Sequence, residues 1–570
     1  MFNYYKLTRG LSAVVLTILA LFLIQSLACA EDLVKLDGNV GSKQMGQSSP
    51  VSPDQSLPLV FGLRIRNQDQ LERLITAQSN PTSPLYHHWL TPAQFEAAYS
   101  PTQSDVDTVS AYLRDHSIRV VSISPNRLLI EALATADKID NVFGVELRQF
   151  ADGFANTKEP QLPDDIAKIV QSIKGLNSRV QLKSKIQASK AKDDEDKNVV
   201  YTPAGIATAY NFANANNANL QDPHEQLDGS GVTIAIVTAY GYNPQDLSDY
   251  YKQFHINHTG KITNIPIGGV SRKLELETTL DLEQVSSQAP AANILMYMAS
   301  APEESLMDEA FNQVVCDNDA DVVSFSWGLP DLVEGWAQIL TTHEIFEQAA
   351  AEGIVIFVAS GDDGAYYQDS PFSDAELVTD YPSSDPLVTG VGGTTLLMDK
   401  TKRLSEVAWS GSGGGISAYF DRPAWQRGKG VPEYGWYLPA NQKRMGCDVS
   451  LVADPVTGYA TCFMGRFFSI GGTSAAAPNW AALWSLAEQA AHGRIGGGNQ
   501  TIYAIGNSGA DRAAVFHDIT SGDNGNDVGP GYKAGEGWDY PTGWGTPDGM
   551  KLIRWLVKHK PATTADDLHG

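Results

Sequence analysis

Hydrophobic residues after Val199 fall into continuous runs of strand length, and helix-like segments such as "ESLMDEAFNQVV" and "THEIFEQAAAEG" lie between several of them. The runs are "GVTIAIVTAY", "ANILMYMA", "ADVVSFSWG", "GIVIFVASGDDG" and "DPLVTGVGGTTL". Strands without regular polar positions are buried on both faces, so the pattern predicts an α/β fold with a parallel sheet flanked by helices. In such sheets, the catalytic and binding residues lie beyond the carboxyl ends of the strands, which is where "SWG" and "SGDDG" occur.

A different pattern runs from Leu57 to Ala151. "LPLVFGLRI" and "RLLIEAL" alternate like strands, whereas "NQDQLERLITAQ" and "SDVDTVSAYLRDHS" have helical spacing. This mixture predicts a separate α+β domain. The polar stretch "QLKSKIQASKAKDDEDKN" that follows is nearly free of large apolar residues, so we expect an exposed, flexible linker that a protease can cut. The predicted order is residues 31–180 as the α+β domain, 181–198 as the linker and 199–570 as the second domain.

The first thirty residues have the order of a secretory signal peptide. Lys6 and Arg9 precede "LSAVVLTILALFLIQ", and the segment ends in Ala28-Cys29-Ala30. We expect cleavage after Ala30 and a secreted protein, with the periplasm as the alternative location. A lipid-bearing Cys29 is disfavoured by Ser26, and an uncleaved anchor by the shortness of the segment. No later segment is apolar enough to cross a bilayer, so no stable membrane anchor is expected after signal removal.

The amino-acid composition limits the classes of binding partner. Hydrophobic residues make up 42% and charged residues 19% of the 570 residues, as in a globular protein. A formal net charge of −25 argues against nucleic acid as a partner, because a phosphate-binding surface must be basic. An acidic surface is also one that a protein working at low pH tolerates. We expect a monomer.

Three cysteines remain after signal removal. Cys447 and Cys462 flank a loop containing Gly and Pro, and in an oxidising compartment they can form a disulfide, although spacing alone leaves the pairing open. Cys316 lies in the apolar stretch "FNQVVCDNDADVV" and is expected to be a buried thiol rather than a catalytic one.

The segment "IGGTSAAAPNW" raises two interpretations of Ser474. Ser474 can cap the following helix. Alternatively, it can be a nucleophile, with Gly471 and Gly472 allowing a substrate chain to approach it closely. A nucleophile needs a base, and the chain has no "HGTH"-like run. His343 is the best placed histidine, and we interpret it as a surface or satisfied core residue, which disfavours a histidine-based triad.

Carboxyl groups offer an alternative base. Glu277 and Asp281 in "KLELETTLDLEQ" are four residues apart on a predicted helix, so they share one face. Their repulsion favours a shared proton and a raised pKa, which makes Glu277 a candidate base held by Asp281. Taken alone, this segment favours a solvated acidic face. Asp362 in "SGDDG" follows a buried strand, and in protonated form it can donate to an oxyanion, although the same sequence is common in turns.

These features together resemble the sedolisins, the serine-carboxyl peptidases. The resemblance extends through residues 200–550 and is carried by "GGTSAAAP", "ELETTLDLE", "VVSFSWG", "VASGDDG", "YPSSDPLVTGVGGT", "SGGGISAYFDRPAWQ" and "GWDYPTGWGTP". The first domain resembles the activation propeptide of pro-kumamolisin in "SPLYHHWLTPAQFEAAYSPT". The resemblance implies a subtilisin-like fold and an acid-active peptidase made as a self-processing zymogen, more often an endopeptidase than a tripeptidyl-peptidase. Protein or peptide substrates are implied as partners, with the propeptide as intramolecular inhibitor and chaperone.

The resemblance also assigns roles to residues. It implies Ser474 as nucleophile, Glu277 as base, Asp281 as its orienting partner and Asp362, rather than Asp363, as the oxyanion acid. It further implies one structural Ca²⁺ held by the side chains of Asp518 and Asp539 and the carbonyls of Ile519, Gly535 and Gly537. An ordinary Gly-rich loop is the alternative for the calcium site.

Three other functions fit parts of the sequence. A binding protein on an inactive peptidase scaffold is disfavoured because all four predicted catalytic residues are present. A histidine-based subtilisin-like peptidase would depend on His343. A glycosidase with paired carboxylates would leave "GGTSAAAP" unexplained.

Overall fold

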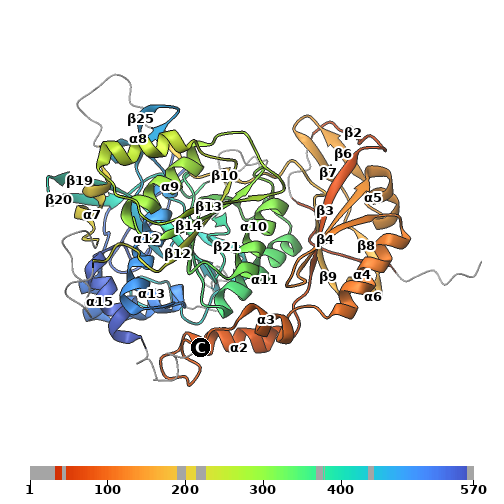
Figure 1. Cartoon of the computed structure of the whole chain (residues 1–570), viewed down its shortest axis with the longest axis horizontal. Coiled ribbons are helices and arrows are strands. Elements are labelled where there is room, and N and C mark those ends of the chain that lie inside the picture. The colour runs from red at the N-terminus through yellow and green to blue at the C-terminus, as the bar shows by residue number, and fades with distance from the viewer. Residues whose placement is uncertain are drawn as a thin grey trace, which may run out of the picture.

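The computed structural model describes residues 33–41, 46–188, 200–212, 226–366, 377, 379–433 and 442–560. The predicted signal peptide, residues 1–30, lies outside these residues. Within the part that is described, no helix is both long enough and apolar enough to cross a membrane. Figure 1 shows two domains side by side, with most of the N-terminal residues in one and the remainder in the other, while α2 (Gln68–Gln78) and α3 (Pro92–Ala98) run beneath the larger domain.

The larger domain is built on an eight-stranded sheet, in agreement with the predicted parallel arrangement. Its order is β13-β14-β12-β15-β17-β19-β20, with β23 also paired to β19. All pairs are parallel except β19 with β20. The strands are β12 (Thr233–Ala239), β13 (Ile262–Ile267), β14 (Asn293–Ala299), β15 (Val322–Phe325), β17 (Val355–Ala359), β19 (Thr389–Asp399), β20 (Lys402–Ala408) and β23 (Val449–Val452).

Helices cover both faces of this sheet, and successive strand residues alternate between two cores. Ile234 and Ile236 of β12 belong to the core beneath α9 and α12, whereas Ala235 and Val237 belong to the core beneath α10 and α11. Because each side chain points to the face opposite its neighbour's, a strand buried on both sides must be apolar at every position. The helices are α8 (Pro244–Phe254), α9 (Leu276–Gln288), α10 (Glu304–Asp317), α11 (Trp336–Ala351), α12 (Thr473–Ala491), α13 (Gly498–Asn507), α14 (Gly509–Val515) and α15 (Gly549–His559).

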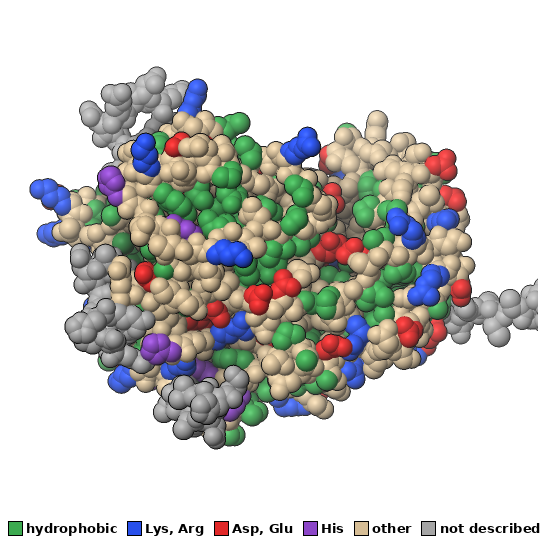
Figure 2. Space-filling model, viewed as in Figure 1, with side chains coloured by type: hydrophobic (Ala, Val, Ile, Leu, Met, Phe, Trp, Pro, Cys, Tyr) green, Lys and Arg blue, Asp and Glu red, His purple; other side chains and the backbone are tan. Residues whose placement is uncertain are grey.

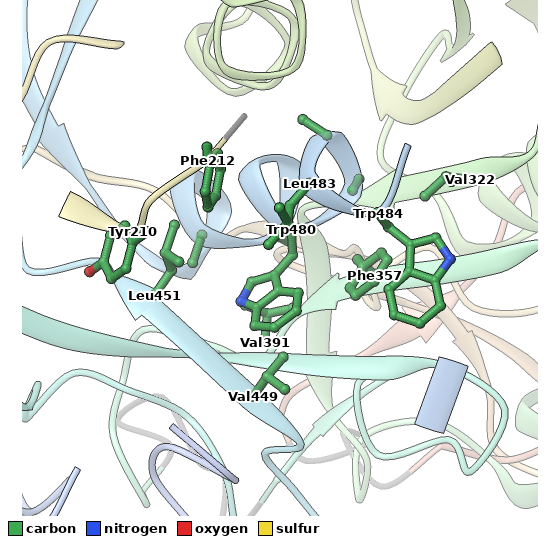
Figure 3. Packing of buried hydrophobic residues seen from close by; sticks show 14 of the residues in the cluster. Tyr210, Phe212, Val322, Phe357, Val391, Val449, Leu451, Trp480, Leu483 and Trp484 are labelled. Atoms are coloured by element: carbon green, nitrogen blue, oxygen red, sulfur yellow. The ribbon is translucent and has the colours of Figure 1, made fainter. Parts of the chain in front are cut away.

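Helix α12 is buried along its whole length. Trp480 and Trp484 of α12 pack on Phe357 of the central strand β17, with ring centroids 6.0 and 5.7 Å away (Figure 3). The alanine-rich first turns bring the helix close to α9, which lies on the same face of the sheet. This contact fixes the start of α12 relative to α9 and the central strands.

The smaller domain has the predicted α+β composition. An antiparallel sheet of order β4-β5-β3-β9 packs against helices around a separate hydrophobic core. Its main elements are β3 (Ser56–Leu63), α2 (Gln68–Gln78), α3 (Pro92–Ala98), α4 (Gln103–Asp115), β4 (Arg119–Ile123), β5 (Leu129–Thr135), α5 (Ala136–Phe143), α6 (Asp164–Ala167) and β9 (Val170–Lys174). Small two- and three-stranded sheets add β1 (Leu33–Lys35), β2 (Ser49–Pro50), β6 (Leu147–Phe150), β7 (Gly153–Asn156) and β8 (Gln161–Pro163).

The two domains meet at α10 and α11 through apolar as well as polar and charged side chains, and Leu71 and Phe95 of the small domain share a hydrophobic core with Phe311 and Phe346. Asn126 Nδ2 donates to Asn312 Oδ1 at 2.7 Å, and Ser172 Oγ lies 2.7 Å from Thr341 Oγ1. Lys174 is buried between Glu304 and Asp308 of α10. Removing one partner of such a buried ion pair leaves an uncompensated buried charge, which is costly.

On the face in Figure 2, Lys and Arg side chains are interspersed with Asp and Glu, unlike a phosphate-binding groove.

All three described cysteines are free, so the Cys447–Cys462 disulfide that spacing left open does not form. Cys447 Sγ lies 3.5 Å from the carbonyl oxygen of Gly413, whereas Cys462 lies on β24 (Tyr459–Phe463). Cys316 is partly buried, and burial raises its thiol pKa to about 12.

The packing of β17 on α12 predicts the effect of a core truncation. Phe357→Ala should lower the free energy of unfolding by about 3–5 kcal/mol, because it removes a fully buried ring between two indoles. Leu404→Ala on β20 is the control, since Leu404 is 60% exposed and should change stability little. Urea denaturation followed by tryptophan fluorescence measures both, and equal midpoints for the two variants would contradict this packing.

Candidate active site

Ser474 lies in the first turn of α12 and is completely buried. The preceding Gly472 has φ 112°, a conformation that favours glycine. The backbone N–H of Ser474 donates to the carbonyl oxygen of Lys185 at 2.9 Å. The serine is therefore not acting as a side-chain cap; its amide already contacts a peptide carbonyl from elsewhere in the chain.

Glu277 and Asp281 lie one turn apart on α9, as predicted, and both are fully buried. The hydroxyl of Ser474 donates to Glu277 Oε2 at 2.8 Å. The hydroxyl of Ser326 donates to Asp281 Oδ1 at 2.7 Å and lies 3.4 Å from the carbonyl oxygen of Ser474. The solvated acidic face is excluded as an interpretation of this segment.

Burial controls the protonation of the carboxyl pair. It raises the pKa of Glu277 well above its usual value, with repulsion from Asp281 as the next cause, and it raises the pKa of Asp281 to about 8. Glu277 Oε1 and Asp281 Oδ2 are buried without a hydrogen-bond partner among the described residues, so a proton shared between the two carboxyl groups would satisfy both.

Asp362 approaches the start of α12 from the carboxyl end of β17. Its Oδ1 accepts from the backbone N–H of Thr473 at 2.7 Å and from the Thr473 hydroxyl at 2.9 Å. Its Oδ2 has no hydrogen-bond partner among the described residues. Burial raises the pKa of Asp362 to about 7, although the two bonds from Thr473 oppose the shift.

The cleft beside Ser474 is filled by the chain that follows the small domain. Strand β10 (Lys183–Ser184) pairs antiparallel with β16 (Trp327–Pro330), and β11 (Gln187–Ala188) pairs antiparallel with β25 (Arg466–Gly471). Between them, the N–H of Lys185 donates to the carbonyl oxygen of Ser326 at 3.0 Å. An extended chain held by strand pairing on both sides of one residue is a substrate-like arrangement.

The expectation of an exposed linker over residues 181–198 is therefore wrong at its start. Lys183 is exposed, but Leu182 and Lys185 are only 7% and 4% exposed because the chain lies in the cleft. Main-chain pairing and a buried charge, rather than solvation, account for the polar residues in this part of the segment. Residues 189–199 lie outside the described part of the structure.

The Lys185 carbonyl and Asp362 converge on Gly472. A Cβ atom on this glycine would lie 2.3 Å from the Lys185 oxygen and 2.5 Å from Asp362 Oδ2. The carbonyl oxygen therefore has the Ser474 amide on one side and the unpaired carboxyl oxygen of Asp362 near it. Asp363, the neighbour that sequence analysis ranked second, lines a small cavity with Asp380 instead.

None of the hydrogen bonds found around Ser474, Glu277, Asp281 and Asp362 among the described residues involves a histidine. Nδ1 of His343 lies 2.8 Å from Asp385 Oδ2, and although burial lowers its pKa, the Asp385 carboxylate raises it further, to about 9. Its interpretation as a satisfied core residue is confirmed. At the end of β12, where a histidine-based relative would carry an aspartate, Thr238 Oγ1 instead accepts from Trp327 Nε1 at 3.1 Å.

The five predicted calcium-binding residues lie together near the C-terminus. Asp518 Oδ2 accepts from the N–H of Gly537 at 2.9 Å, and Asp539 Oδ2 accepts from the N–H of Gly535 at 3.0 Å. Asp518 Oδ1 is buried without a partner among the described residues. Within those same residues, the carbonyl oxygens of Ile519, Gly535 and Gly537 accept no hydrogen bond. These oxygens are the hard donors that Ca²⁺ prefers, so the residues fit the ion.

Sequence reasoning missed several residues of the site. Ser326 stands in the "SWG" segment noted at a strand end, and its position there was the available signal. Thr473, which holds Asp362, directly precedes the nucleophile candidate. Lys185 and Asp380, whose side chains form an ion pair, had no local signal, because their contact depends on the path of the chain through the cleft.

The fold and this site define a class. A parallel sheet with a buried serine at a helix start, hydrogen-bonded to a carboxyl group and facing a strand-paired peptide, is the arrangement of a subtilisin-like serine peptidase with carboxyl groups in place of histidine. Family models agree: residues 196–545 match the subtilase family, and residues 43–179 match the pro-kumamolisin activation domain.

Known relatives specify the class further. Sedolisin of Pseudomonas sp. (strain 101) is 30% identical over 529 residues, covering 87% of this chain and 86% of the relative. Kumamolisin of Bacillus sp. (strain MN-32) is 29% identical over 546 residues, covering 90% and 94%. A solved structure of Pseudomonas sedolisin, a serine-carboxyl proteinase complexed with two molecules of pseudo-iodotyrostatin, matches with a TM-score of 0.54 and 28% identity, covering 63% of this chain and 99% of that one. The chain belongs to the sedolisin family of serine-carboxyl peptidases and carries an activation domain.

The close approach at Gly472 gives a test of the site geometry. Gly472→Ala should lower kcat/KM on a denatured protein substrate by roughly 100-fold, because the new methyl group displaces both Asp362 and the bound peptide carbonyl. Gly465→Ala is the matched control: its φ is also positive, at 71°, but a Cβ there meets nothing within 4 Å. Equal losses in both variants would show that backbone strain, rather than crowding, is responsible.

Proposed function

We propose that the protein is a secreted, acid-active endopeptidase in which Ser474 is the nucleophile, Glu277 the base, Asp281 its orienting partner and Asp362 the oxyanion acid. One observation carries the proposal. The Ser474 hydroxyl is bonded to Glu277 at 2.8 Å while the Ser474 amide is bonded to a peptide carbonyl oxygen at 2.9 Å. Nucleophile, base and scissile group are thereby brought together.

In the first step, Ser474 Oγ attacks the carbonyl carbon and its proton passes to Glu277 Oε2. The carboxyl pair then holds two protons and no net charge, which a buried, poorly solvated position favours. Ser326, through its bond to Asp281, keeps that partner oriented. The developing oxyanion receives hydrogen bonds from the Ser474 amide and from protonated Asp362, each worth about 3 kcal/mol in comparable sites.

In the second step, the carbon–nitrogen bond breaks and Glu277 returns the proton to the leaving amine. The acyl group stays on Ser474 until water, deprotonated by Glu277, attacks it and regenerates the hydroxyl. The same residues therefore act twice, first with the amine and then with water.

The contacts of the chain upstream of Lys185 support endopeptidase action. Upstream of the Lys185 carbonyl, Leu182 N–H donates to the carbonyl oxygen of Pro302 at 2.9 Å, and Gln181 pairs with Glu303. A tripeptidyl-peptidase reads a free amino group three residues before the cut, at the position of Lys183. Here the chain continues past that point while still in contact with the catalytic domain.

The precursor arrangement supports a zymogen. The small domain is docked on α10 and α11, and the chain leaving it occupies the cleft, so substrate is excluded until this chain is cut. We expect maturation at acid pH by cleavage within residues 181–200, with the propeptide acting as inhibitor and chaperone. The signal-like residues 1–30 favour secretion.

A structural Ca²⁺ would be held by the carboxylates of Asp518 and Asp539 and the carbonyls of Ile519, Gly535 and Gly537. Burial raises the pKa of Asp539 to about 7, and repulsion from Asp518 contributes. A divalent cation would neutralise these two charges and join the 518–519 and 535–539 segments. Its role would be stabilising, because these residues are separate from the carboxyl groups around Ser474.

The protonation of Asp362 predicts the pH dependence. Only the protonated acid donates, so activity should be present at acid pH and be lost as the pH rises through about 7. Acid-matured wild type, Ser474→Ala and Asp362→Asn are compared on a denatured protein from about pH 3 to 9. Ser474→Ala should be inactive.

The Asp362→Asn variant separates the oxyanion role from a structural one. An asparagine amide donates at every pH, so its lower activity should no longer decline near pH 7. A variant that keeps the wild-type decline would contradict the assignment of Asp362, and full activity in Ser474→Ala would contradict the proposed nucleophile.

The calcium site predicts a metal-dependent stability. Ca²⁺ at about 100 times its Kd should raise the free energy of unfolding by about 2.7 kcal/mol, and EDTA should remove this gain. Asp518→Asn and Asp539→Asn should abolish the Ca²⁺-dependent shift in Tm measured by scanning calorimetry. Asp523→Asn, in the exposed turn of the neighbouring "DNGND" segment, is the control that should retain it. A shift of equal size in all variants would contradict the site.

A further inference from the structure

Lys185 is the residue whose carbonyl oxygen contacts the Ser474 amide, and its side chain is buried beside the catalytic groups. Its ammonium group pairs with Asp380 of β18 (Asp380–Tyr381). The two side chains are only 5% and 16% exposed. Among the described residues, Lys185 is the one cation paired with Asp380.

The space around this side chain is a narrow channel between backbone segments. Gly328 of β16 forms one wall, since a Cβ there would lie 3.3 Å from Lys185 Cε. Gly361, Gly413, Gly414 and Asp363 line the cavity next to Asp380. A Cβ on Gly361 would lie 2.7 Å from Asp380 Oδ2. Glycines thus leave room for a long, thin side chain, and the far end of the channel is acidic.

The charges around the channel are all of one sign. Asp380, Asp363 and Asp362 each favour the charged form of Lys185, with Asp380 dominant, and together they outweigh the burial that would lower its pKa. An uncharged side chain in the same channel would leave the largely buried carboxylate of Asp380 without the lysine partner that it has here. Leaving a buried charge unpaired is costly, so the channel discriminates against apolar residues as well as accepting basic ones.

We propose that Asp380 is the specificity-determining residue of the peptidase, which selects substrates with lysine or arginine on the amino side of the cut bond. This rests on the proposed function of Ser474. It also assigns the first bond cut in maturation: the peptide bond between Lys185 and Ile186.

The chemistry of that first cut balances with water alone. Ser474 Oγ bonds to the Lys185 carbonyl carbon, its proton passes through Glu277 to the Ile186 nitrogen, and the carbon–nitrogen bond breaks. Water then hydrolyses the ester, leaving a carboxyl group on Lys185 and the hydroxyl on Ser474. Ile186 becomes a free amino terminus, and the segment after it can leave the cleft.

The test measures kcat/KM of the enzyme matured in acid from the full-length precursor. The substrates are peptides that differ only in the residue before the cut bond, which is lysine or norleucine, two side chains of similar length. Wild type should prefer lysine by about 100-fold, the effect of removing one partner of a buried charge pair. Asp380→Asn should reduce the lysine-to-norleucine ratio to within about threefold of one, whereas the exposed control Asp399→Asn should retain it. A wild-type ratio near one, or a ratio unchanged by Asp380→Asn, overturns the assignment of Asp380.

The maturation site is tested on the precursor by mass spectrometry of the earliest products. Ile186 should be the first new amino terminus in wild type and in Lys183→Met, and cleavage there should slow by about 100-fold in Lys185→Met. A different first terminus in wild type overturns the assignment of this bond. Peptidase activity that is abolished by Ser474→Ala but lacks a preference for lysine leaves the proposed function intact and rejects only the specificity; activity that survives Ser474→Ala rejects the proposed function itself.

Discussion

The burial of carboxyl groups is the constraint on which the site depends. Glu277 and Asp281 are inaccessible to solvent, and Asp362 is 8% exposed. An ionised carboxylate in such surroundings lacks the solvation that water would give it, so the proton is retained and the pKa rises. A peptidase without a catalytic histidine needs this retention, because a carboxyl group can donate to an oxyanion only while it is protonated. On the proposed mechanism, the loss of activity above about pH 7 is thus a consequence of the packing.

The architecture brings these groups together from four separate segments. Glu277 and Asp281 come from α9, Ser474 from the start of α12, Ser326 from the end of β15 and Asp362 from the end of β17. The carboxyl ends of parallel strands meet at one edge of the sheet, and the two helices contact each other on one face. Rigid elements on both sides of the cleft therefore hold the serine and its carboxyl partners at hydrogen-bonding distance, and the fold itself does much of the positioning.

The sequence could predict the sheet, the α+β domain and the helical pairing of Glu277 with Asp281, because each is written in local periodicity. Whether that pair was a solvated surface could not be decided locally, since burial of α9 depends on α12, nearly two hundred residues away. The linker was misjudged for a related reason. Polar composition indicates solvation only where the backbone is unpaired. In Lys183–Ser184, strand pairing with β16 supplies the backbone hydrogen bonds that water would otherwise make. The free Cys447 and Cys462 illustrate the same limit, because their spacing in the sequence does not say where the fold places the two side chains.

The precursor holds a peptide in the position of a substrate without any evident distortion of the site, which raises the question of what delays its cleavage. On the proposed mechanism, the answer is the protonation of Asp362. Above its pKa of about 7, its unpaired Oδ2 is an acceptor beside the Lys185 carbonyl oxygen and would repel a developing oxyanion. Below that pKa the same atom carries a proton and can donate. One carboxyl group can therefore hold the zymogen inactive at neutral pH and complete the oxyanion site in acid, with no rearrangement of the chain other than the movement of a proton.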